Sequence, residues 1–301
     1  MKLSPFDGAR LYRGNLHGHS THSDGFKTPQ EVIETYKNLG YDFTCLSDHL
    51  WADSSFAATT ICEASSDDEG FITIPSAELH CLGKKFDNDG LWHLVANGLP
   101  VDFEAADNTE TAPQLIERAQ KAGAFVTIAH PEWYSLTSEE ALVVSAADAV
   151  EVYNHACFLE TARSSGVACA DYLLQEGKDV HLTAADDSHF RLDDAGGGWV
   201  MVAASELSEK AVISALKAGS FYASTGPSIT EMSLSDDKLE IRCSAARSII
   251  VSGAGYSALN QNGHSLTKAE FDLSHFNSDW FRVTITDAAN RHAWSNRYWR
   301  V

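Results

Sequence analysis

The chain is rich in histidine, and many of its histidines stand close to acidic residues. Thirteen histidines occur in 301 residues. The densest group reads LHGHSTHSDG over residues 16–25, with His17 and His19 separated by one residue and Asp24 five residues further on. Side chains two positions apart on a strand point to the same side, so both imidazoles can reach one cation. The spacing therefore predicts a metal site at the end of a strand.

The same residue types recur after other expected strands. They are Asp48 with His49, Glu78, His130, and Asp187 with His189. In a parallel (β/α) barrel the carboxyl ends of the strands converge on one face, which is where barrel active sites lie. Imidazole and carboxylate ligands suit Zn, Mn or Fe. The six cysteines form no C-x-x-C pair, which argues against a structural cysteine-rich zinc site.

The first two thirds of the chain alternate apolar runs with capped amphipathic segments, as repeated β-α units do. Thr28-Pro29-Gln30-Glu31 combines an N-cap, a proline at the first helical position and a capping-box glutamate, and it predicts a helix that ends at Gly40. Further helices are expected from Thr111, from Thr137, over 159–175 and over 209–217, and strands over 43–47, 71–74, 124–129, 149–153, 180–184 and 199–202. About six or seven such units in about 220 residues favour a (β/α) barrel, and the absence of a Gly-rich phosphate loop argues against an open doubly wound sheet.

The pattern changes after Thr225-Gly226-Pro227. Segments 239–243, 249–251 and 281–286 alternate apolar and polar residues with period two, and no helix signature interrupts them. We therefore predict two domains: a barrel over residues 1–227 and a small all-β domain over residues 228–301.

Composition narrows the possible partners and location. Lys and Arg number 22 against 42 Asp and Glu, a formal net charge of −20, which repels a phosphate backbone at long range and argues against a duplex nucleic-acid partner. The apolar runs are short, and residues 1–5 lack the apolar core of a signal peptide, so neither membrane insertion nor secretion is expected. These features predict a cytoplasmic protein with reduced thiols.

The ordered motifs resemble those of the PHP superfamily, named for its polymerase and histidinol-phosphatase members. The matching residues are His17-x-His19, Ser23-Asp24-Gly25, Ser47-Asp48-His49, Glu78, His93, His130-Pro131 and Asp187-x-His189. The resemblance implies a distorted (β/α)7 TIM-like barrel. Residues 221–227, with 286–287 and 293–296, further resemble the carbaryl-hydrolase-like branch, whose members carry a C-terminal β domain.

The resemblance also implies two or three divalent metal ions. His17, His19, Glu78 and Asp187, the expected catalytic group, would hold the first ion; Glu78, His93 and His130 the second; Asp24, His49 and His189 the third. Two assignments have alternatives, because His80 also follows Glu78 closely and Asp186 is adjacent to Asp187.

Such a cluster predicts a hydrolase. Paired metal ions lower the pKa of a bound water toward neutrality and present hydroxide to the scissile bond. We expect a phosphoesterase that acts on a small phosphorylated molecule or nucleotide, since incompletely neutralised cations attract an anionic substrate. A carboxyl ester or carbamate hydrolase on the same metal site is the alternative, and a non-catalytic metal-binding accessory protein is the second alternative.

Three residues are weaker candidates for substrate contact. Arg191 could clamp a phosphate through its planar guanidinium or simply lie on the surface. His22 could orient a metal ligand or belong to a loop. Asn154, with Glu151, stands at a strand end and could line the pocket.

Overall fold

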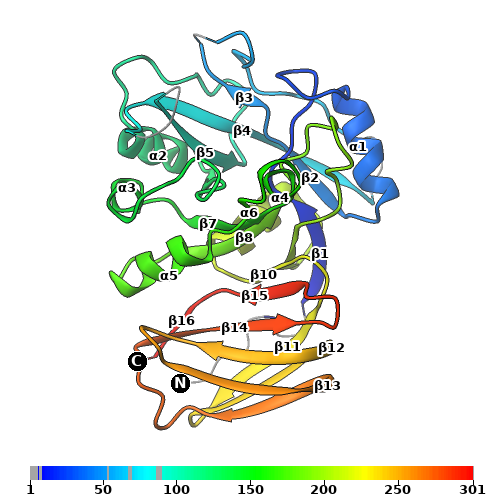
Figure 1. Ribbon diagram of the computed structural model, residues 1–301. Helices are drawn as coiled ribbons and strands as arrows, with labels where there is room; N and C mark the ends of the chain where they lie inside the picture. Colours follow the sequence, from blue (N-terminus) through cyan, green and yellow to red (C-terminus); the bar gives the residue numbers. More distant parts are fainter. Residues whose placement is uncertain (1–5, 7–8, 53, 67–69, 86–89, 301) are drawn as a thin grey trace.

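A single mixed sheet runs through the whole molecule, which the computed structural model describes over residues 6, 9–52, 54–66, 70–85 and 90–300 (Figure 1). Its strands are β1 (Arg10–Asn15), β2 (Phe43–Leu46), β3 (His49–Leu50), β4 (Ile72–Leu82), β5 (Leu91–Asn97), β6 (Phe125–Ile128), β7 (Ala149–Asn154), β8 (His181–Ala185), β9 (Trp199–Ala204), β10 (Phe221–Ser224), β11 (Ile229–Ser235), β12 (Lys238–Ser252), β13 (Ala258–Asp272), β14 (Trp280–Thr286), β15 (His292–Ser295) and β16 (Tyr298–Trp299). The helices are α1 (Pro29–Asn38), α2 (Ala112–Lys121), α3 (Ser138–Val143), α4 (His155–Thr161), α5 (Val167–Gln175) and α6 (Glu209–Lys217).

The N-terminal part of the sheet is only partly a β-α repeat. Parallel pairs join β1 to β2, β2 to β4, β6 to β7 and β7 to β8. The other pairs are antiparallel: β5 pairs with β4 on one side and with β6 on the other, and β1 pairs with β9. The strand order is β9-β1-β2-β4-β5-β6-β7-β8. The last strand, β8, lies close to β9 and β10, but among the described strands it forms no hydrogen-bonded ladder with either.

The mixed α/β class agrees with the prediction, but the (β/α)7 TIM-like barrel is not confirmed. A TIM barrel needs parallel strands that each lead into a helix. Here β4 runs to β5 as a hairpin, and no helix lies among the described residues between them. The expected strand at 71–74 is the start of an eleven-residue strand, β4, that continues through Glu78.

Local capping signals explain where the helices begin. Thr28 and Thr137 both form the predicted capping boxes, with Glu31 and Glu140. The helix expected over 159–175 is instead two helices, α4 and α5. Ala162 ends α4 in a left-handed conformation with φ of 56°, so the chain turns before α5 begins.

The C-terminal strands form an antiparallel region that continues the same sheet. β10 pairs with β9 on one side and with β15 on the other (Figure 1). This pairing joins the C-terminal strands, β11 through β16, to the rest of the sheet. A separate apolar core lies in this region, centred on side chains such as Ile241, Ile249 and Phe281. The predicted domain boundary at 227 and 228 stays a prediction.

The helices of the described part are short. None combines the length and the apolar character that a membrane-spanning helix needs.

Candidate metal centre

Nine predicted ligand residues come together at one end of the N-terminal strands. His17 and His19 follow β1, His49 begins β3, and Glu78 and His93 lie within β4 and β5. His130 comes after β6, while Asp187 and His189 come after β8. Asp24 lies in the loop between β1 and α1. Strand pairing fixes their relative positions, because His49 is the register partner of Glu78 in a parallel ladder.

Backbone hydrogen bonds join the first and last of these segments. The N–H of His19 donates to the carbonyl of Ser188 over 2.9 Å, and the N–H of Asp187 donates to the carbonyl of His17 over 2.9 Å. Gly18 and Ser188 form a parallel bridge between them. Residues almost 170 positions apart in the chain are therefore held side by side by the backbone.

Glu78 is the carboxylate around which the cluster gathers. Its side chain is 1% exposed. Ring nitrogens of five histidines lie 2.7 to 3.5 Å from its two oxygens; the five are His17, His19, His49, His93 and His130. A carboxylate has about four lone-pair positions, so neutral imidazoles cannot all donate to it at once.

A second carboxylate completes the centre. Asp187 lies 2.9 Å from Nε2 of His19 and 3.2 Å from Nε2 of His17. Burial works against its charge, but His17 and His19 hold the pKa of Asp187 well below its usual range. Burial also opposes the charge on Glu78, and His49 with His130 and His17 holds its pKa well below the usual range. Both groups are carboxylates at neutral pH.

The outer part of the cluster contains Asp24 and His189. Oδ1 of Asp24 lies 3.4 Å from Nε2 of His189 and 3.6 Å from Nε2 of His49. Burial tends to lower the pKa of His189, but Asp24 and Asp187 raise it to about 9. Conversely, burial tends to raise the pKa of Asp24, but His189 and its neighbours lower it to about 2.

Four groups of potential ligand atoms lie within 4.8 Å of one another: His17, His19, Glu78 and Asp187; Glu78, His93 and His130; His19, Asp24, His49 and His189; and His49, Glu78 and His80. Two of these groups are identical to ion sets that the PHP resemblance implies, and a third contains the implied set Asp24, His49 and His189 with His19 in addition. That these groups hold ions stays a prediction.

The chemistry of this donor set fits divalent cations. Buried carboxylates are normally paired with a cation, yet neither Glu78 nor Asp187 has a lysine or arginine partner within the described ranges. Nδ1 of His19 and Nδ1 of His130 are buried without a hydrogen-bond partner among the described residues. Imidazole nitrogens and carboxylate oxygens facing a common point are the ligands that Zn, Mn and Fe accept.

Two of the candidate ligands hold unusual backbone conformations. His130 has φ of 23° and Asp187 has φ of 55°, both in the left-handed region that residues other than glycine rarely adopt. Such conformations persist when the surrounding structure requires them, and they occur often at functional sites. Here the positive φ values accompany the turn of the His130 side chain toward Glu78 and of the Asp187 side chain toward His17 and His19.

Further polar residues hold the candidate ligands in place. Oε1 of Glu151 lies 3.0 Å from Nδ1 of His17, and Oε2 accepts from the N–H of His130 over 2.8 Å. On the other side, Nδ1 of His80 lies 3.1 Å from the carbonyl of Trp92, and its Nε2 lies 2.8 Å from Nδ1 of His49.

The neighbouring carboxylates Asp48 and Asp186 have structural partners. Asp48 accepts from the backbone and hydroxyl groups of Ser20 and Ser23, which orders the loop before Asp24. Asp186 accepts from three consecutive backbone N–H groups, at residues 196–198, and from the hydroxyl of Tyr36. Asp187, and not Asp186, therefore faces the cluster.

A cavity of about 230 Å³ opens onto the cluster. Phe56, Leu91 and Trp133 give it apolar walls, and Arg191 lies at its rim. The guanidinium of Arg191 donates to Oδ2 of Asp24 over 3.1 Å, and the side chain is 49% exposed. Arg191 can therefore turn toward an anion without leaving a buried charge unpaired.

The other two weak candidates do not line this cavity. A ring nitrogen of His22 lies 2.8 Å from the carbonyl of Thr60, away from the cluster, so the interpretation of His22 as a loop residue is favoured. Asn154 is buried and donates to Glu151 and Asp187, and its carbonyl oxygen accepts from the N–H of Cys157 at the start of α4. Asn154 thus positions carboxylates and caps a helix, and its contact with a substrate stays a prediction.

Sequence reasoning did not single out the apolar walls. Trp133 stands three residues after His130 and could have been noticed in the loop after a predicted strand. Phe56 lies in a segment without a clear pattern, and only the folded chain brings it to the cavity.

Comparison with known proteins bears on the fold of the chain. No protein-family model matches the chain, and no curated protein matches it. Among solved structures, a two-domain protein from Bacteroides vulgatus, described as containing a predicted PHP-like metal-dependent phosphoesterase, aligns over 98% of this chain and 96% of its own with a TM-score of 0.54 and 16% identity. The chain has a PHP-like fold. The carbaryl-hydrolase-like branch is not confirmed.

Two further alignments with solved structures are partial. A candidate metal-dependent phosphoesterase from Bifidobacterium adolescentis covers 58% of this chain and 87% of its own, with a TM-score of 0.40 and 14% identity. An amidohydrolase from Chromobacterium violaceum with bound sulfate and no metal covers 60% of this chain and 89% of its own, with a TM-score of 0.42 and 13% identity. TM-scores below 0.5 do not define a shared fold.

Proposed function

We propose that the protein is a metal-dependent phosphoesterase that hydrolyses a small phosphorylated molecule or nucleotide. The observation that carries this proposal is the convergence of five imidazoles on the buried carboxylate of Glu78, beside Asp187, at the base of a cavity. The whole-chain similarity to a protein described as PHP-like supports the fold on which this site is built.

The proposed ions would be held by the three ligand sets named above, with Glu78 shared between two of them. When bound, such ions supply Lewis-acid polarisation of substrate oxygens and acidify a water molecule. Zn, Mn and Fe all suit these ligands.

The chain's own residues would prepare the site in three ways. Glu151 would accept a hydrogen bond from the Nδ1–H of His17, so that the Nε2 lone pair of His17 would be free to bind a cation lying between it, Glu78 and Asp187. Phe56 and Trp133 restrict water at the cavity wall. Arg191 is placed to bind a phosphate oxygen, and a planar guanidinium suits that geometry.

The reaction class can be tested with three chromogenic substrates. We expect protein loaded separately with Zn, Mn or Fe to cleave p-nitrophenyl phosphate or bis-p-nitrophenyl phosphate. Cleavage of p-nitrophenyl acetate alone would instead support the carboxyl ester or carbamate hydrolase, and cleavage of none would support the non-catalytic accessory protein.

Matched variants connect the activity to this site. Glu78→Gln keeps the size of the side chain but removes the shared charge, and we expect it to abolish turnover. His264→Ala, on the exposed face of β13 in the C-terminal region, is the control and should retain the full rate. Equal rates for wild type and Glu78→Gln would contradict the proposal.

A further inference from the structure

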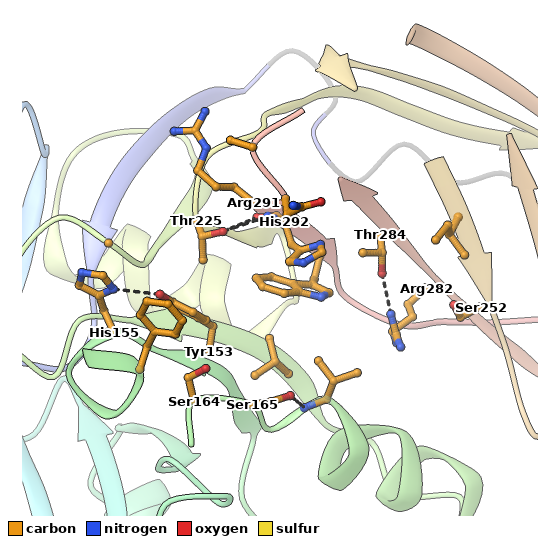
Figure 2. Close-up of a pocket in the computed structure, with 18 of the residues that line it drawn as sticks. Tyr153, His155, Ser164, Ser165, Thr225, Ser252, Arg282, Thr284, Arg291 and His292 are labelled. Carbon is orange, nitrogen blue, oxygen red and sulfur yellow. Dashed lines mark hydrogen bonds between the residues drawn. The ribbon is translucent and has the colours of Figure 1, made fainter. Parts of the chain in front are cut away.

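A second and larger cavity lies where the N-terminal strands meet the C-terminal strands. Its volume is about 870 Å³, within the usual range for small-molecule sites, which often lie at such junctions. We call it the junction cavity. Figure 2 shows residues of β7 and α4, such as Tyr153 and His155, on one side, and Arg282, Thr284 and His292 of β14 and β15 on the other.

Aromatic side chains form much of the wall of the junction cavity. The rings of Tyr153 and Trp294 lie 6.5 Å apart at an interplanar angle of 24°, and Phe158 lies 6.2 Å from Tyr153. Phe158 is 52% exposed, so part of its ring is open to a ligand. Aromatic faces of this kind bind planar rings by stacking and by burial of apolar area.

The charged groups of the junction cavity are already neutralised. Arg282 forms two hydrogen bonds of 2.7 Å with the carboxylate of Asp171 and a third, also 2.7 Å, with the hydroxyl of Thr284. Arg291 is paired with Asp287 at 2.8 Å. An ionic ligand would therefore have to compete with an internal ion pair, so this cavity favours an uncharged ligand.

Several polar groups remain available to an uncharged ligand. The hydroxyls of Ser164 and Ser252 line the cavity and have no recorded hydrogen-bond partner among the described residues. The imidazoles of His155 and His292 each use Nδ1 internally, with Tyr153 and Thr286, and leave Nε2 open. Burial lowers the pKa of His292, so its ring is neutral near pH 7.

We propose that the junction cavity is a second ligand site, which takes an uncharged aromatic molecule carrying hydroxyl groups. The rings would stack against the aromatic wall, and the hydroxyls would pair with the serine hydroxyls and imidazole nitrogens. This proposal does not depend on the reaction catalysed at the metal centre.

Helix α4 separates the two sites. His155 and Phe158 face the junction cavity, while Ala156 and Cys157 line the cavity above the metal cluster. The two cavities share no lining residue. Variants of one site can therefore be tested without changing the side chains of the other.

The test is titration calorimetry of the 301-residue protein with 2-naphthol, an uncharged aromatic alcohol. We expect saturable one-to-one binding that Phe158→Ala weakens at least about fivefold, since an aromatic wall is lost. Because Phe158 is half exposed, this variant should fold normally. Ser252→Phe, which fills the cavity, should also weaken binding. The matched control is Phe26→Ala, another exposed phenylalanine outside both cavities.

Three comparisons make the assignment falsifiable. Glu78→Gln should leave 2-naphthol binding unchanged, and 2-naphthoate, which carries a negative charge, should bind at least about tenfold more weakly than 2-naphthol. Absence of saturable binding, equal losses in Phe158→Ala and Phe26→Ala, loss of binding in Glu78→Gln, or tighter binding of 2-naphthoate would each overturn the proposal.

Discussion

The carboxylate of Glu151 lies 3.0 Å from Nδ1 of His17, on the opposite edge of the imidazole from Glu78. Both side chains are almost completely buried, so this contact fixes the orientation of the ring. Carboxylates placed in this way behind a metal-binding histidine hold one tautomer and make the ligand nitrogen more basic. Glu151 is thus a positioning residue for the proposed site.

Glu151→Gln should therefore weaken metal binding while the fold persists. Loss of such a partner typically reduces metal affinity about 10- to 100-fold. Competition titration with a chromogenic chelator measures the affinity, and circular dichroism checks the fold. The control is Glu240→Gln, on an exposed position of β12, which should bind metal normally. Unchanged affinity in Glu151→Gln would show that the contact with His17 does not support metal binding.

Mutation of Asp186 should mainly reduce folding stability, whereas mutation of the adjacent Asp187 should mainly reduce metal binding. Asp186→Ala leaves three backbone N–H groups at residues 196–198, one buried and two part-buried, without an acceptor, and we expect a loss of about 3 kcal/mol in the free energy of unfolding. Asp187→Ala should cost less stability in the metal-free protein but abolish tight metal binding. Denaturant unfolding and metal titration on both variants test this contrast, and the reverse pattern would contradict it.

His181 should make stability depend on pH. The ring packs against Phe125 and Phe221, and burial, reinforced by Arg297, lowers its pKa from 6.5 to about 4. Above pH 6.5 both the folded and unfolded states hold the neutral ring. Between pH 6.5 and 4 only the unfolded state takes up the proton, so stability falls as the pH falls, by at most about 3 kcal/mol.

Replacing His181 with leucine tests this pH dependence. The difference in unfolding free energy between pH 7 and pH 4 should be smaller in His181→Leu than in wild type, with both proteins metal-free. His275→Leu, at an exposed position, should show the wild-type pH dependence. Identical pH profiles for wild type and His181→Leu would refute the assignment of this effect to His181.

The ion pair between Arg282 and Asp171 connects β14 to α5. Removal of Asp171 should cost more stability than removal of Arg282. The Arg282 side chain is 6% exposed, whereas that of Asp171 is 36% exposed. Asp171→Ala leaves a buried guanidinium unpaired and should cost about 3 kcal/mol, while Arg282→Met leaves a carboxylate that water can reach and should cost about 1 kcal/mol. Equal losses measured by denaturant unfolding would contradict this asymmetry.

Most candidate ligands were predictable because they stand at the end of an apolar strand or beside a turn in the sequence. Glu78 and His93 instead lie within β4 and β5, and His93 was expected only from the PHP resemblance. The start of α1 was equally predictable, from the capping box at Thr28. Spacing also separated the candidate Asp187 from Asp186, although the reason lies in the glycine N–H groups that Asp186 binds.

The arrangement of the strands was not predictable in the same way. The β4 to β5 hairpin places His80 opposite His93 in an antiparallel register, so both reach Glu78 or its neighbour His49. Period-two alternation indicates strands but does not give their pairing direction. The roles of Glu151 and Trp133 likewise depend on contacts between segments distant in the chain.

Anomalous scattering at the Fe, Mn and Zn absorption edges from crystals of the metal-loaded protein tests the central claim most directly. The account predicts anomalous peaks within bonding distance of Glu78 and Asp187, and their absence in crystals of Glu78→Gln. Crystals of loaded wild-type protein with no anomalous peak among these imidazoles and carboxylates would contradict it.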